Sequence, residues 1–154
     1  MEFERIEKAA FTVIGKLGST DEGSGFIAKL WDKANAGFNE IKHLVLFDES
    51  CKPMGIYGAM SDMGMNFEPW ENNFSKGYYL AGVQCRNDAV APDGWTKWTI
   101  PGFVFLKVKV TGPDTFKNMI SYMNENSIPL AGAVHDFTDP KTGQGFMLFP
   151  IKKI

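Results

Sequence analysis

The chain has 154 residues, which is enough for one domain with its own core and too short for two domains of ordinary size. Its net charge of −2 comes without a long run of lysine or arginine, so direct binding to nucleic acid is disfavoured, because phosphate contacts need clustered cations. No segment approaches the ~20 apolar residues of a membrane span, and the N-terminus is too charged for a signal peptide, so we expect a cytoplasmic protein with no membrane partner. Two cysteines cannot build a disulfide scaffold, so we expect both to be free thiols.

The first half of the chain predicts the order strand, helix, strand, strand. An apolar run over residues 9–16 predicts the first strand. Apolar residues spaced at i, i+4 predict a helix over residues 25–38 that packs on a sheet by one face. Residues 55–61 and 78–86 predict two further strands, whereas residues 41–50 fit either a short strand or a loop.

Two irregular segments interrupt these elements. Residues 62–76 are polar and carry Trp70, and a loop of this length inside a compact domain is often functional, although a solvated excursion fits equally well. Residues 87–102 predict a loop with Trp95 and Trp98. Tryptophan rings are costly to leave in water, so we expect them to cover a cleft or the edge of the core.

The second half repeats the same order. Residues 103–110 predict a strand, and a Pro-Asp start signal precedes a helix over residues 114–125. Residues 130–137 and 145–151 predict the last two strands, joined by a turn over residues 138–143.

The sequence therefore predicts one α+β domain built from two strand–helix–strand–strand modules, over about residues 6–87 and 102–154. Both helices would cover the same face of a curved, mostly antiparallel sheet. The junction of the two modules would then leave a cleft, and clefts of this kind hold ligands.

Aromatic side chains are the candidates for lining this cleft. Along residues 103–110, Phe103 and Phe105 share a face with two lysines, which argues against coverage by a helix, so we expect them at the open cleft rather than at the rim of the sheet. Trp31 fits the core or the cleft, and the pleat leaves open which of Tyr78 and Tyr79 faces the ligand. The remaining candidate rings are Tyr57, Trp70, Trp95 and Trp98.

Asp136 is the principal polar candidate. It follows the apolar run of residues 130–134, where a carboxyl group must find a partner or shift its pKa. Such an acid suits recognition of a cation or general acid–base catalysis, and a cap of the turn at residues 138–143 is an equally good interpretation. Glu68 is a secondary candidate, or a solvated loop charge. No metal-ligand or cofactor motif is present, so we expect no cofactor.

Several short segments resemble the GyrI-like small-molecule-binding family, which includes the effector-binding domains of AraC-type and MerR-type regulators and integron-associated binding proteins. Their order and spacing carry the resemblance over nearly the whole chain. The matching segments are LW (30–31), GIY (55–57), YLAGV (79–83), PDGW (92–95), TIPG (99–102) and FPIK (149–152).

The resemblance implies a two-module fold that binds hydrophobic, often cationic compounds between the modules. It places Asp136 where the family commonly has a glutamate at the pocket floor, and Phe105 where a tyrosine is more usual. Three hypotheses follow from it: a small-molecule-binding protein that sequesters a compound or reports it to a regulator partner, a hydrolase of a reactive cyclopropane-containing compound, and a protein-interaction module. A homodimer is compatible with all three.

Overall fold

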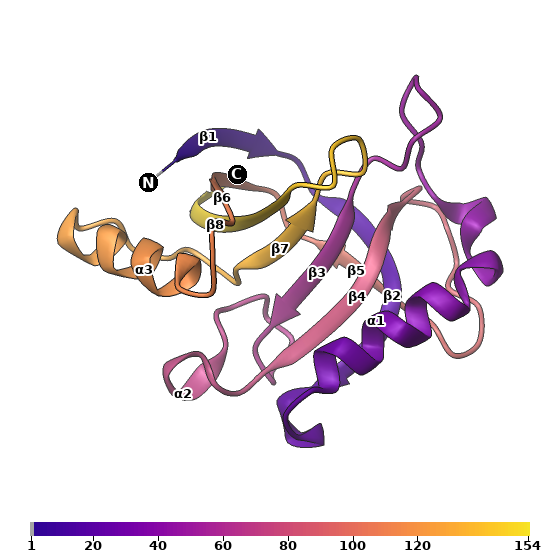
Figure 1. The fold of residues 1–154 in the computed structure, drawn as a ribbon, viewed down its shortest axis with the longest axis horizontal. Helices are drawn as coiled ribbons and strands as arrows, with labels where there is room; N and C mark the ends of the chain where they lie inside the picture. The colour runs from indigo at the N-terminus through magenta and orange to yellow at the C-terminus, as the bar shows by residue number, and fades with distance from the viewer. Residues whose placement is uncertain (1) are drawn as a thin grey trace.

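The computed structural model describes residues 2–154, and Figure 1 shows their fold. The α-helices are α1 Phe26–Ala36, α2 Glu71–Phe74 and α3 Thr115–Glu125. The strands are β1 Phe3–Lys8, β2 Phe11–Ser19, β3 Ile56–Ser61, β4 Tyr78–Cys85, β5 Thr96–Ile100, β6 Phe103–Lys109, β7 His135–Thr138 and β8 Gly145–Lys153. The fold is α+β, as the sequence predicted.

All eight strands form one antiparallel sheet in the order β1-β6-β8-β7-β3-β4-β2-β5. Strands β2, β3 and β4 with helix α1 repeat the chain order of β6, β7 and β8 with helix α3. The two sets meet where β3 pairs with β7. The strand–helix–strand–strand order is therefore present twice, with β1 and β5 added at the outer edges.

The two added strands cross between the sets. β1 runs into β2 but pairs with β6, and β5 runs into β6 but pairs with β2. Only residues 9–10 and 101–102 make these connections, and one residue spans at most ~3.6 Å. The outer edges of the sheet must therefore come close together, and a Cβ on Gly102 would lie only 3.0 Å from the backbone nitrogen of Ala10. This constraint curls the sheet.

Both long helices lie on the same face of the sheet. Helix α1 packs Leu30 and Ala34 into one cluster with β2 and β4, and helix α3 packs Met119 and Met123 into another with β6 and β8. Cross-strand partners connect the two clusters across the same face, because Met147 lies opposite Asp136, Asp136 opposite Gly58, and Gly58 opposite Ala81. In Figure 1, β7, β3 and β4 lie between the two helices. The predicted placement of the helices is confirmed.

The opposite face of the curled sheet is filled by aromatic rings. Phe103 and Phe105 of β6 share a buried cluster with Tyr57 and Trp98, and Phe105 is 0% exposed. The expectation that Phe103 and Phe105 line an open cleft was therefore wrong. They are free of helix coverage, as their alternation indicated, but the curl of the sheet encloses them.

Several local details differ from the sequence-based expectations. Residues 3–8 form β1, which the sequence analysis missed, and β2 begins at Phe11 rather than at residue 9. Trp98 lies on β5 and not in a loop. Residues 42–44 form a short 3-10 helix, and β7 begins at His135 rather than at residue 130. Within residues 2–154, no helix has the length and apolar character needed to cross a bilayer.

Replacing Phe105 with alanine tests the enclosed face. We expect the free energy of unfolding to fall by about 3–5 kcal/mol, the usual cost of removing a buried phenylalanine ring. Phe47→Ala is the matched control, because that ring is 42% exposed, and we expect it to cost less than about 1 kcal/mol. Denaturant titrations measure both values, and an equally small loss for Phe105→Ala would contradict the enclosed position.

Candidate functional site

Tyr79 crosses from one half of the sheet to the other. Its ring lies over Gly58 of β3, where a Cβ atom would collide with the phenol oxygen. The Tyr79 hydroxyl thereby reaches β7 and donates a hydrogen bond to Asp136 Oδ2 at 3.0 Å. A glycine at position 58 is therefore required for the contact between the two strand–helix–strand–strand sets.

Trp31 extends this contact to helix α1. Its Nε1 donates a hydrogen bond to the Tyr79 hydroxyl oxygen at 3.2 Å, and the two rings meet edge to face. Burial and the neighbouring Asp136 carboxylate raise the pKa of Tyr79, so its hydroxyl stays protonated and donates. We call Trp31, Tyr79 and Asp136 the central line.

Asp136 carries a carboxylate with unmet hydrogen-bonding capacity. The side chain is half-buried, and desolvation raises its pKa, while the hydrogen bond from Tyr79 works in the opposite direction. Its Oδ1 atom accepts no hydrogen bond from residues 2–154, and no salt bridge reaches the side chain within that range. The carboxylate does not cap the 138–143 turn, because Asp139 accepts the Lys141 N–H there.

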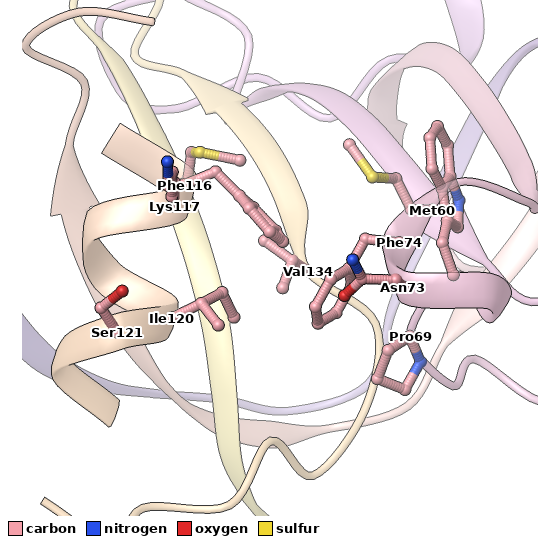
Figure 2. Close-up of a pocket in the computed structure, with 11 residues that line it drawn as sticks. Met60, Pro69, Asn73, Phe74, Phe116, Lys117, Ile120, Ser121 and Val134 are labelled. Atoms are coloured by element: carbon pink, nitrogen blue, oxygen red, sulfur yellow. The ribbon is translucent and has the colours of Figure 1, made fainter. Parts of the chain in front are cut away.

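A cavity of about 540 Å³, cavity 1, lies beside the central line on the helix-bearing face. Met60 and Met147 contribute to its wall and are the cross-strand partners of Tyr79 and Asp136. Figure 2 shows side chains of α3 facing those of the 69–74 segment across the cavity. The other lining residues are Pro69, Trp70, Asn73, Phe74, Phe116, Lys117, Ile120, Ser121 and Val134.

The segment that contains α2 forms the second wall of cavity 1. Phe74 meets Phe116 of α3 edge to face, with ring centroids 5.0 Å apart. Trp70 is held by a hydrogen bond from its Nε1 to the Tyr78 carbonyl at 3.0 Å. Asp62 fixes the start of the segment by accepting the Asn66 N–H at 2.8 Å.

A second cavity of about 280 Å³, cavity 2, lies beneath α1. Trp31 lines it and so joins it to the central line. The Trp95 Nε1 donates to Glu40 Oε1 at 2.9 Å, which satisfies the polar atom of a second lining ring. The other lining residues are Ala34, Asn35, Phe38, Ile41, Pro53, Ile56, Gly82 and Val83.

The structure thus divides the predicted site residues between two faces. Those on the helix-bearing face, in the central line or a cavity wall, are Trp31, Trp70, Tyr79, Trp95 and Asp136. Those on the enclosed face are Tyr57, Tyr78, Trp98, Phe103 and Phe105. Of the two neighbouring tyrosines, Tyr79 faces the helices. Glu68 is exposed, and its backbone N–H donates a hydrogen bond to the Asp62 carboxylate.

Trp70 is the one lining residue of cavity 1 that the sequence marked as a candidate, and the large apolar side chains that it did not mark include Met60, Phe74, Phe116 and Met147. Phe116 lies on the apolar stripe of α3, a position that favours the core in a sequence pattern. No comparable signal marked Phe74, which reaches the cavity through a left-handed backbone turn with φ of 63°.

His135 takes no part in either cavity. It is fully buried on the enclosed face, where burial lowers its pKa to about 4, and its Nδ1 accepts the Met60 N–H at 3.0 Å. Its neutral ring therefore holds strand β3 in place. Among residues 2–154, no three side chains of His, Cys, Asp or Glu are grouped so as to hold a metal ion.

A scan of protein-family models and a search of curated proteins give no match. Solved structures do resemble the chain. SAV2435 bound to tetraphenylphosphonium superposes with a TM-score of 0.65 at 15% identity, over 99% of this chain and 94% of that one. The C-terminal domain of EcmrR superposes with a TM-score of 0.65 at 13% sequence identity, over 100% of both chains. An integron cassette protein from Vibrio cholerae superposes with a TM-score of 0.53 at 16% sequence identity, over 98% of this chain and 95% of that one. These likenesses establish the fold, and they agree with the resemblance to GyrI-like effector-binding domains.

The raised pKa of Asp136 predicts a gain in stability when its charge is removed. A folded-state pKa above the unfolded value means that the ionised carboxylate destabilises the fold, and the penalty develops as pH rises from the ordinary aspartate pKa of about 3.9. Asp136→Asn keeps an acceptor for the Tyr79 hydroxyl, so we expect a higher free energy of unfolding at pH 7 than in the wild type. The difference should vanish near pH 3 in denaturant titrations. A less stable variant at pH 7 would contradict this account.

Proposed function

We propose that the chain is a small-molecule-binding protein that takes a hydrophobic cation in cavity 1, with Asp136 as the counter-charge. The carrying observation is that a half-buried carboxylate with no cationic partner among residues 2–154 stands beside a largely apolar cavity, whose one lining lysine, Lys117, is exposed to solvent. An unpaired ionised group in such surroundings is unfavourable, and a bound cation relieves that cost.

The cavity wall fits such a ligand. Trp70, Phe74 and Phe116 offer aromatic faces, which attract cations, and aromatic edges, which pack against other flat rings. Met60 and Met147 are flexible and polarisable, so they adapt to different apolar shapes. The wall thus supplies contact area, and Asp136 supplies the preference for positive charge.

The structural comparison supports the same ligand class. SAV2435, which shares the fold over nearly its whole length, is solved with tetraphenylphosphonium, a hydrophobic cation. We propose that the bound compound is sequestered or reported to a regulator, as the likeness to the EcmrR C-terminal domain suggests.

The affinity for tetraphenylphosphonium tests the counter-charge. We expect Asp136→Asn to weaken binding by about 30-fold, or about 2 kcal/mol, because one partner of a partly buried charge pair is removed while the cavity wall remains. Isothermal calorimetry or fluorescence titration measures the change. Neutral triphenylphosphine oxide should bind the wild type and the variant within about threefold of each other.

Glu68→Gln is the matched control for this experiment. It also removes one carboxylate near cavity 1, but Glu68 is exposed, so salt and water screen its charge and the affinity should stay within about twofold. If Glu68→Gln and Asp136→Asn weaken binding equally, the general field of the protein attracts the cation and Asp136 has no special role.

A hydrolase is the second candidate, and the central line is the observation that favours it. In this line Asp136 accepts a hydrogen bond from the Tyr79 hydroxyl, and the same hydroxyl oxygen accepts one from the Trp31 indole N–H. In this arrangement the Tyr79 hydroxyl can give its proton to the opening ring while the Asp136 carboxylate takes a proton from the attacking water. Transfer of that proton from Asp136 to Tyr79 then restores both groups, so the substrate gains one water in total.

Turnover of a cyclopropane-containing aromatic compound tests this candidate by mass spectrometry. A hydrolase should form a product whose mass is increased by one water, and Tyr79→Phe should slow its formation at least tenfold while binding is retained. Binding of the intact compound without product would exclude the activity for that compound.

A further inference from the structure

Cavities 1 and 2 flank the same central line. Met60 and Met147, the cross-strand partners of Tyr79 and Asp136, line cavity 1. Trp31, which donates to Tyr79, lines cavity 2. The Asp136 carboxylate therefore lies between the walls of the two cavities on the helix-bearing face.

Strand β3 gives the spacing between the cavities. Ile56 lines cavity 2, Gly58 lies beneath the Tyr79 hydroxyl, and Met60 lines cavity 1. These three residues share one face, and a strand advances ~3.3 Å per residue, so the two walls lie about 13 Å apart with the carboxylate about midway. The geometry gives a charge at the centre and an apolar space about 6–7 Å away on each side.

We propose that the site takes a cation with two apolar arms of unequal size, the larger in cavity 1 and a single ring in cavity 2. This inference rests on the proposed cation binding and adds the shape of the ligand to it. It assigns a second binding subsite, formed by α1 and the 37–56 segment, to a ligand whose positive centre lies beside Asp136.

The size and chemistry of cavity 2 match one aromatic ring. Its volume of about 280 Å³ exceeds the ~150 Å³ of an apolar protein cavity that accepts benzene. The indole N–H groups of Trp31 and Trp95 already have acceptors, so neither ring presents an unpaired donor to the space. Asn35 supplies an exposed polar group at its edge. An apolar arm therefore fits better than a polar one.

Two phosphonium probes separate this inference from the proposed function. Methyltriphenylphosphonium carries only the bulky group, whereas 4-phenylbutyl-triphenylphosphonium adds one ring on a four-carbon arm. We expect the phenylbutyl compound to bind the wild type at least tenfold more tightly, measured by calorimetry, because its ring is removed from water in cavity 2.

Ala34→Leu fills part of cavity 2 and should remove this tenfold gain, while Ala36→Leu, on the exposed side of the same helix, should retain it. Asn35→Phe, at the exposed edge of the cavity, repeats the test if Ala34→Leu fails to fold. A gain that survives both cavity-2 substitutions overturns the second subsite, as does equal binding of the two probes to the wild type. Failure of both probes to bind the wild type overturns the proposed function itself.

Discussion

The hydrogen bond from Tyr79 to Asp136 is the interaction on which the candidate site depends. It joins β4 to β7 across Gly58, and it therefore links the two strand–helix–strand–strand sets at the centre of the sheet. It occupies only one carboxylate oxygen and brings no positive charge. Asp136 is thus held in place without being neutralised, which is the condition in which a carboxylate recognises a cation or takes part in proton transfer.

The curl of the sheet decides which aromatic residues are available to a ligand. β1 leads into β2 but pairs with β6, and β5 leads into β6 but pairs with β2. The face away from the helices therefore closes around its own side chains. Phe105 and Trp98 stabilise that closed face. The helix-bearing face stays accessible between α1 and α3, and there the rings of Trp31, Trp70 and Phe116 surround two separate cavities.

The sequence predicted the two long helices and the doubled order and marked Asp136 as a candidate, because apolar spacing and an acid after an apolar run are local signals. It did not reveal α2, which lies in a segment that looked irregular. It also did not reveal β1, whose six residues FERIEK include four charged side chains, or β5, which looked like a tryptophan-bearing loop. β1 and β5 close the sheet. The alternation of residues along β6 could therefore assign its side chains to two faces of the sheet, but it could not show which of these faces is open to solvent. The choice between Tyr78 and Tyr79 likewise depends on register, which only strand pairing fixes.

The central claim is that Asp136 must be ionised to hold a cation, and proton release on binding tests it most directly. Calorimetric titration of tetraphenylphosphonium in buffers of different ionisation enthalpy measures the protons released at each pH. Because burial raises the pKa of free Asp136 and a bound cation lowers it, the account predicts proton release in the pH window between these two pKa values, and this release should disappear in Asp136→Asn. Tight binding without proton release at any pH between 4 and 7, or release that persists in the variant, would contradict it.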